Sequence, residues 1–314
     1  MSTATLAPVD LFRRMLFLRL IDERLDELCA GPLRGLPLHL SLGQEAVAVG
    51  VAAHHGPDDV MVSTHRGVGH VLAWGADPER VLAEVIGRRG GYARGLAGHM
   101  HIVAPESGVL GTNGIVGGGL PMAVGAAFGL RRLGKPAISV AFMGDGAANT
   151  GAAHEALNLA AAWRLPVLFV LEDNGLAEMT YSAPQTGGDL RERAMSYGLL
   201  TEQVDASDAV AVEAACGALF EVVRGEGRPA VLVCEAFRAK GHFAGDAQLY
   251  RDPEDDALRE PRDPLMHIRR ELGEEEVGAA REAVAGTVDA LFETVLAMPA
   301  PTRADLFELW GPER

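Results

Sequence analysis

The stretch 137–174 constrains the fold of this chain more than any other, because it places two apolar runs on either side of one helical segment. Residues 137–143 (AISVAFM) predict a buried strand, since the run is apolar, partly β-branched and ends at a Gly-Asp-Gly turn. The following segment carries Ala and Leu at helical spacing through Trp163, and Asn149 or Thr150 is its expected N-cap. The pattern predicts a strand that leads into a helix.

A second apolar run starts at Pro166 and ends at Asn174. In a strand-helix-strand unit the crossover brings both carboxyl ends to the same edge of a parallel sheet. Asp145 follows the first strand and Asn174 ends the second, so we expect the two side chains to face one ion. Carboxylate, amide and backbone carbonyl oxygens suit magnesium or calcium better than zinc. The spacing therefore predicts an α/β domain with a divalent cation site that holds a diphosphate.

Two other interpretations of these residues stay open. Gly144 and Gly146 follow a strand, and Glu172 lies near the end of the next one, as in a dinucleotide-binding fingerprint. The third glycine of that fingerprint is replaced by Asn149, so the pattern is incomplete. Alternatively, Asp145 and its downstream asparagine are ordinary turn formers.

The composition indicates a globular protein. The chain has 314 residues, of which 48% are hydrophobic and 23% charged, enough for one large α/β domain over residues 1–314. We expect an N-terminal helical arm over about 1–36 and a C-terminal helical extension over about 262–314. The net charge is −15 and Lys and Arg do not cluster, so nucleic acid is not expected as a partner.

The cysteines and the apolar runs indicate a reducing compartment and no membrane anchor. Cys29, Cys216 and Cys234 are few, widely spaced and set in apolar surroundings, which predicts reduced packing residues. The apolar run 15–18 is too short for a signal-peptide core, and no run approaches the length of a membrane span. We therefore expect a cytoplasmic protein.

Other elements follow from apolar spacing and from Gly and Pro positions. Residues 87–114 are a long Gly- and His-rich loop region, and residues 238–251 are a second loop. The predicted strands cover 59–63 and 229–235, and the predicted helices cover 8–29, a segment from about 43, 78–86, 118–133, 206–224 and 274–298.

Five further segments accompany the Gly-Asp-Gly and Asn pattern in order along the chain. They are HLSLGQEAV (39–47), STHRG (63–67), GTNGIVGGGLP (111–121), EDNGLAEMT (172–180) and GHFAGDAQLYR (241–251). The Gly-Asp-Gly turn followed about thirty residues later by Asn174 resembles the thiamine diphosphate motif, and the five segments resemble the α subunits of 2-oxo acid dehydrogenase first components. EDNG and the last segment are most like the acetoin type, because pyruvate-type chains usually read ENN and HGHS. The resemblance implies a three-layer thiamine diphosphate-binding fold with a mostly parallel sheet flanked by helices.

The resemblance also implies roles for individual residues. Arg66 and His242 match an arginine and a histidine beside the diphosphate, although a surface salt bridge and an exposed loop histidine are the plain alternatives. Asp145, Asn174 and the backbone carbonyl of Leu176 match the Mg²⁺ ligands. The full expected set of cofactor-binding residues is Arg66, Gly114, Val116, Gly144, Asp145, Gly146, Ala147, Asn174 and His242.

Some positions depart from the family pattern. Val68 stands where the family usually has a catalytic histidine, and valine moves no proton. His65 and His70 flank it and are, with His242, the candidates for proton transfer. Residues 95–101 read GLAGHMH where the family usually has GKGGSMH. His101 matches the family pattern, whereas His99 replaces a serine. Lys240 adds a cation near the expected substrate site, and Phe243 replaces a serine that is phosphorylated in pyruvate-type chains.

The resemblance implies a partner and a reaction. The glutamate that contacts the aminopyrimidine ring comes from the β subunit in this branch, and Glu45 is not that residue, so we expect a heterotetramer of two α and two β chains. The implied activity is cleavage of acetoin, or decarboxylation of a 2-oxo acid such as pyruvate, with transfer of the acyl group to a lipoyl-bearing transacylase. Thiamine-dependent acyl transfer or acyloin formation without lipoamide is a second interpretation, and a cofactor-binding paralogue with weakened catalysis is a third.

Overall fold

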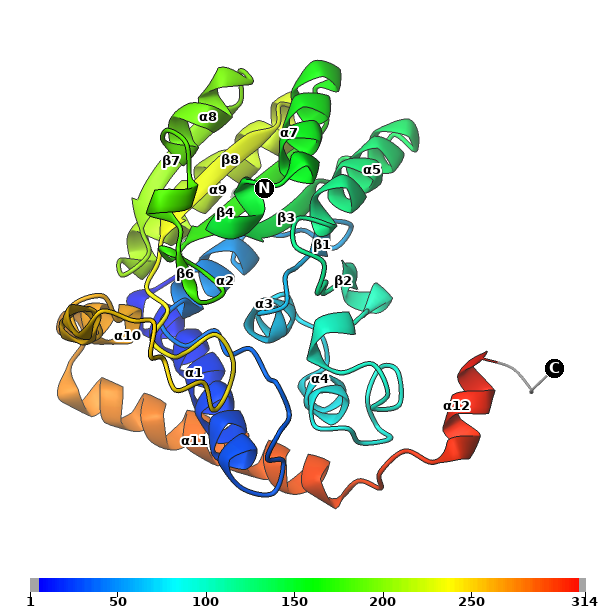
Figure 1. Cartoon of the computed structure of the whole chain (residues 1–314), viewed down its shortest axis with the longest axis vertical. Helices are drawn as coiled ribbons and strands as arrows, with labels where there is room; N and C mark the ends of the chain where they lie inside the picture. Colours follow the sequence, from blue (N-terminus) through cyan, green and yellow to red (C-terminus); the bar gives the residue numbers. More distant parts are fainter. Residues whose placement is uncertain (1–5, 311–314) are drawn as a thin grey trace.

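Six parallel strands form one sheet at the centre of the molecule (Figure 1). The computed structural model describes residues 6–310, so both ends of the domain expected over 1–314 lie outside the described residues. Every strand pair in this sheet is parallel, which confirms the expected α/β class. The order across the sheet is β2 (Val109–Gly111), β1 (Val60–Val62), β3 (Ser139–Gly144), β4 (Val167–Asp173), β8 (Ala230–Glu235) and β7 (Leu200–Asp205).

Helices cover both faces of the sheet, which confirms the three-layer arrangement. Alternate residues of β4 belong to different cores: Leu168 and Val170 pack on one face, Phe169 and Leu171 on the other. The core on the first face contains side chains of α1 (Pro8–Ala30), α2 (Glu45–Ala52), α3 (Val68–Ala73), α4 (Pro78–Val85), α9 (Ala209–Glu226) and α11 (Glu274–Ala297). Of these, α9 packs directly on the strands, whereas α11 packs on α1 and α4. The second face is covered by α5 (Gly119–Arg132), α7 (Gly151–Trp163) and α8 (Leu190–Ser196).

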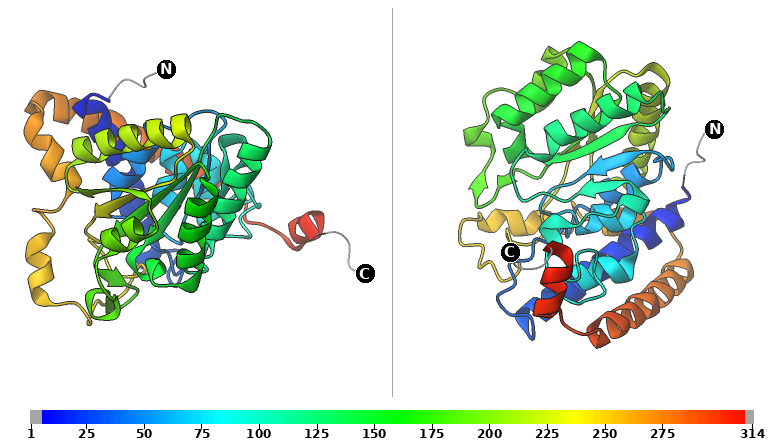
Figure 2. Two further views of the ribbon diagram at one scale, coloured as in Figure 1. Left: turned by 90° about the horizontal axis from the view of Figure 1, so that it is seen from above. Right: turned by 90° about the vertical axis from the view of Figure 1, so that its right-hand side faces the viewer.

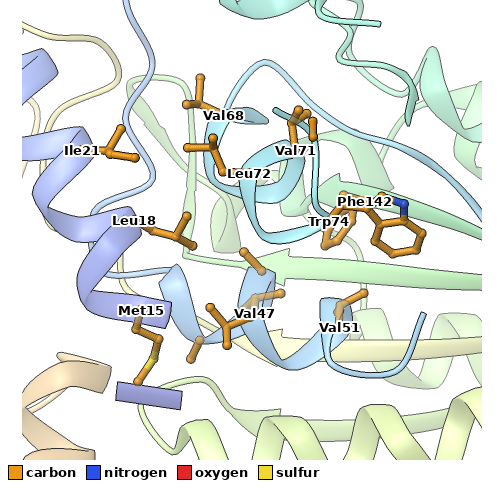
Figure 3. Close-up of a cluster of buried hydrophobic side chains, with 14 of the residues drawn as sticks. Met15, Leu18, Ile21, Val47, Val51, Val68, Val71, Leu72, Trp74 and Phe142 are labelled. Atoms are coloured by element: carbon orange, nitrogen blue, oxygen red, sulfur yellow. The ribbon is translucent and has the colours of Figure 1, made fainter. Parts of the chain in front are cut away.

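The core on the first face joins α1, α2 and α3 to the sheet (Figure 3). Complete burial of one such aliphatic side chain contributes roughly 1.5–3 kcal/mol, so this layer is a large share of the stabilising energy. Its labelled members are Met15, Leu18, Ile21, Val47, Val51, Val68, Val71, Leu72, Trp74 and Phe142.

The Gly-Asp-Gly turn differs from the sequence expectation in one respect. Asp145 begins a single helical turn, α6 (Asp145–Ala148), before α7 starts. The hydroxyl of Thr150 accepts a hydrogen bond from the backbone N–H of Ala153 at 3.2 Å, so Thr150 is the N-cap rather than Asn149.

Short elements account for most of the remaining differences. The predicted loop 87–114 contains β2 and two 3₁₀ turns, η1 (His99–His101) and η2 (Pro105–Ser107). The edge strand β7 was not predicted, because its polar, half-exposed sequence LTEQVD lacks the apolar run of a buried strand. A small hairpin follows β4, formed by β5 (Leu176–Ala177) and β6 (Thr180–Tyr181).

The C-terminal part packs along the outside of the molecule. After β8 the chain passes through η4 (Pro253–Leu258), α10 (Pro264–Ile268) and η5 (Arg269–Glu271), and α11 then packs against α1 (Figure 1). The last helix, α12 (Arg303–Trp310), projects from the body in Figure 1 and in the left-hand view of Figure 2. Within residues 6–310, no helix combines the length and the apolar character needed to cross a membrane.

Candidate functional site

A cavity of about 410 Å³ opens at the carboxyl edge of the sheet. Loops after β1, β3, β4 and β8 contribute to its wall, as expected for an open parallel α/β sheet. Of the residues singled out from the sequence, the cavity is lined by His65, Arg66, Gly114, Val116, Gly144, Asp145, Gly146, Ala147, Asn174, Leu176 and His242.

Asp145 is a buried carboxylate at the end of β3, with 2% of its surface exposed. Its Oδ1 accepts from the backbone N–H of Gly146 at 2.8 Å, and its Oδ2 accepts from the hydroxyl of Ser182. Burial, and then repulsion from Asp145, raise the pKa of Asp173 above its ordinary value. The negative charge concentrated here favours a bound cation.

Asn174 is oriented by the residues around it. Its Nδ2 donates to Oε1 of Gln44 at 2.9 Å, and its Oδ1 accepts from the backbone N–H of Leu176 at 3.1 Å. Gln44 is only 2% exposed, and its Nε2 has no hydrogen-bond partner among the described residues. An unpaired buried donor on a cavity wall costs about 1–3 kcal/mol, which a bound acceptor would recover.

Two buried arginines make the wall strongly basic. Arg66 donates to the carbonyls of Leu40 at 2.8 Å and His242 at 2.9 Å, and Arg238 donates to the hydroxyl of Tyr250 at 2.9 Å. Among residues 6–310 neither forms an ion pair with a carboxylate, and Nε of Arg238 has no partner. Burial, followed by repulsion between the two guanidinium groups, lowers the pKa of Arg66 to about 9. Buried cations without a counterion predict an anionic ligand.

Four histidines, here called the histidine cluster, meet beside Arg66: His39, His65, His99 and His242. Nδ1 of His39 lies 2.9 Å from Nε2 of His99, and Nε2 of His39 lies 3.3 Å from Nε2 of His242. The ring of His65 meets that of His39 edge-on, with centroids 4.8 Å apart.

Burial is the main cause of low pKa values throughout the histidine cluster, and the positive charge of Arg66 lowers them further. The pKa falls to about 2 for His39, about 3 for His65, and about 4 for His99 and His242. All four rings are therefore neutral at pH 7.

Three other residues singled out from the sequence lie away from the cavity lining. His70 is 2% exposed, with Nδ1 at 2.8 Å from the hydroxyl of Ser63 and Nε2 at 3.1 Å from Oε1 of Glu172, so it orders two lining residues from outside the cavity. Val68 belongs to the hydrophobic core (Figure 3). Lys240 pairs with Asp26 at 3.0 Å, so the expected cation near the substrate is at the surface instead.

The loop before His99 is fixed by Glu84 of α4, a fully buried carboxylate. Its Oε2 accepts from the backbone N–H groups of Ala93 at 2.6 Å and Gly95 at 3.0 Å, and its Oε1 accepts from those of Ala97 at 2.7 Å and Gly98 at 3.1 Å. One side chain thereby orders the irregular segment that leads into the histidine cluster.

Sequence reasoning missed several residues of this site. His39 and Gln44 lie in a segment that matched the family, but no role was assigned to them. Arg238 lies at the start of the loop after β8, so its position at the same sheet edge could have been predicted. Ser182 and Glu84 carried no such signal, because their partners are distant in the chain or are backbone groups.

Comparisons with known proteins agree on one family. The family described as "Dehydrogenase E1 component" matches residues 12–296. The α subunit of acetoin:2,6-dichlorophenolindophenol oxidoreductase from Cupriavidus necator is 38% identical over 304 residues, covering 94% of this chain and 91% of the relative. The Bacillus subtilis protein of the same name is 43% identical over 243 residues, covering 77% and 73%. The α subunit of the pyruvate dehydrogenase E1 component from Zymomonas mobilis is 38% identical over 272 residues, covering 84% and 75%.

Proposed function

The chain belongs to the dehydrogenase E1 component family, and we propose that it is the α subunit of a thiamine diphosphate-dependent enzyme that cleaves acetoin. The observation that carries this proposal is that one cavity holds two buried arginines, which have no carboxylate partner among residues 6–310, together with the buried carboxylate of Asp145. A basic wall suits a diphosphate, and the carboxylate suits the cation that accompanies it.

The polar groups of the cavity fit the cofactor. Arg66 and Arg238 would hold phosphate oxygens through their guanidinium groups. Asp145, Asn174 and the backbone carbonyl of Leu176 would hold Mg²⁺, which takes oxygen ligands of these types. Gly146 allows the turn after β3 to lie close to Ala177, since a Cβ at position 146 would lie 2.7 Å from Cβ of Ala177. When bound, thiamine diphosphate supplies the carbon nucleophile and electron sink that the side chains lack.

The chain's own contribution is position, charge and proton placement. Arg66 fixes the loop that carries His242 by donating to its backbone carbonyl. His242 and His65 line the cavity as neutral imidazoles, and each ring has one donor nitrogen and one acceptor nitrogen. His70 supports Glu172 and Ser63 from outside the cavity rather than contacting the ligand.

A β subunit is part of the proposal. At the mouth of the cavity Ile115 is 73% exposed and Val116 is 61% exposed, an apolar surface suited to a partner chain. Glu45 is 1% exposed and accepts from Arg19 at 2.6 Å, and it does not line the cavity. We therefore propose that the partner supplies the carboxylate for the aminopyrimidine ring in a heterotetramer of two α and two β chains. A lipoyl-bearing transacylase is the proposed acyl acceptor.

The test is turnover by the chain coexpressed with a β-type partner. Acetoin, pyruvate and a branched 2-oxo acid are offered with thiamine diphosphate and Mg²⁺, first with an artificial electron acceptor and then with a lipoyl transacylase and NAD. Acetoin turnover in both assays supports the proposal. Turnover only without a lipoyl carrier identifies an acyl-transfer enzyme, and saturable cofactor binding without any turnover identifies a cofactor-binding paralogue; either result contradicts the proposal.

A further inference from the structure

The protons of the histidine cluster are fixed at one end by Arg66. Its Nη2 lies 3.2 Å from Nδ1 of His242. A guanidinium group only donates, so Nδ1 of His242 is the acceptor. A neutral imidazole carries one proton, and that of His242 is therefore on Nε2.

At the other end of the cluster, His99 fixes the position of the His39 proton, independently of Arg66. The backbone N–H of His39 lies 3.4 Å from Nε2 of His99, and Nδ1 of His39 lies 2.9 Å from the same atom. A backbone N–H only donates, so Nε2 of His99 accepts and His39 carries its proton on Nδ1. Nε2 of His39 then presents a lone pair 3.3 Å from the protonated Nε2 of His242.

The surroundings of His99 hold it in this place. The side chain is 3% exposed, and its backbone carbonyl accepts from the hydroxyl of Thr112 at 2.9 Å. Glu84 accepts from four backbone N–H groups of the segment 93–98, which directly precedes His99. His39 and His242 line the cavity, whereas His99 lies outside the lining, so it acts on a ligand only through His39.

We propose that the two Nε2 atoms of His39 and His242 form a recognition site for a substrate hydroxyl group, and that His99 is the positioning residue that keeps His39 in the required tautomer. This inference rests on the proposed function. A hydroxyl group accepts one hydrogen bond and donates another, which matches the protonated nitrogen of His242 and the bare nitrogen of His39. Their direct contact of 3.3 Å is long, so a ligand replaces it at little cost.

The site distinguishes two classes of substrate. An α-hydroxy ketone carries a hydroxyl beside its carbonyl, whereas a 2-oxo acid carries a carboxylate there. A carboxylate only accepts, so it leaves the lone pair of His39 without a donor, and a site built for a hydroxyl discriminates against ligands that leave such a group unpaired. The pair therefore favours α-hydroxy ketones.

The same rings do not suit a metal ion. His39, His65 and His242 offer nitrogens within 4.8 Å of one another. However, a metal bound at Nε2 of His242 would move the ring proton to Nδ1, where it would face the Arg66 donor. The arginine therefore favours the hydroxyl site, and stoichiometric zinc binding that His39→Gln abolishes would overturn the assignment.

The kinetic test compares His99→Leu with its matched control His99→Gln in the complex with the β partner. Glutamine keeps an acceptor for Nδ1 of His39, and leucine does not. We expect His99→Leu to lower kcat/KM for acetoin by roughly 10- to 100-fold and for pyruvate by less than about 3-fold, with His99→Gln close to wild type. Equal losses for both substrates, or no loss for acetoin, overturn the inference.

Imidazole ¹⁵N shifts of the histidine-labelled complex, measured by solid-state NMR, give a readout that needs no turnover. Wild type and His99→Gln should show the Nδ1–H tautomer of His39, and His99→Leu should lose it. If the wild type turns over pyruvate but not acetoin, the hydroxyl site is wrong while the family activity stands. If it turns over neither, the proposed function is wrong, and the spectra alone decide whether His99 positions His39.

Discussion

Replacing Glu84 by glutamine is expected to destabilise the protein strongly, although the change is nearly isosteric. Each carboxylate oxygen accepts from two backbone N–H groups, four in all, at 2.6–3.1 Å. Glutamine keeps one oxygen and turns the other into a donor, so two N–H groups lose their acceptor. At about 1–3 kcal/mol for each unpaired group, the free energy of unfolding should fall by roughly 2–6 kcal/mol. That is a large part of the total stability of a typical domain.

Urea denaturation followed by circular dichroism measures this loss, and hydrogen exchange locates it. Of the four amides that donate to Glu84, either those of Ala93 and Gly95 or those of Ala97 and Gly98 should exchange faster in Glu84→Gln, because glutamine leaves one pair without an acceptor. The matched control is Glu79→Gln, an exposed glutamate at the start of the same helix, which should cost no more than about 1 kcal/mol. A change below about 1 kcal/mol in Glu84→Gln, with unchanged exchange in the loop, would refute the reasoning.

Three further predictions follow from the site and the core. Asp145→Ala should weaken thiamine diphosphate binding in the presence of Mg²⁺ by roughly 10- to 100-fold without unfolding the chain, and calorimetry with an unchanged affinity contradicts the cation site. Because the pKa values of the histidine cluster are low in the folded chain, the unfolded chain binds more protons than the folded chain below pH 6.5. The free energy of unfolding should therefore fall as the pH is lowered from about 6.5 to about 4, by at most about 1.4 kcal/mol per pH unit for each histidine. Asp22, whose burial raises its pKa to about 7, acts in the opposite direction over this window, so Asp22→Asn should steepen the dependence in denaturation curves. Thr150→Ala removes the N-cap of α7 and should lower the free energy of unfolding by about 1 kcal/mol, whereas the matched change Asn149→Ala should lower it less. An equal loss of stability in the two variants would contradict the cap assignment.

The sequence predicted the central strands because their chemistry is local. β4 is an apolar run that ends at Asp173 and is followed by Asn174, and a buried parallel strand requires such a run. Because the carboxyl ends of parallel strands meet at one edge of the sheet, Asp145 and Asn174 could be predicted to lie together, and both line the cavity.

The histidine cluster was not predictable in the same way. His39 and His242 are 203 residues apart, and only the folded loops bring their rings into contact. His70 is near the matched arginine in sequence, yet the turn into α3 directs it to Ser63 and Glu172 rather than to the cavity. The sequence singled out His65, His70, His99 and His242, but neither His39 nor the contacts among the rings.

The strand order has a consequence for synthesis of the chain. β8 lies between β4 and β7, although it is made after both. On the ribosome, a nascent chain that ends before residue 230 has no neighbour for one side of β4, and its apolar hydrogen-bonding edge stays open to other chains. Premature termination in this gene is therefore expected to yield insoluble fragments rather than a smaller folded unit.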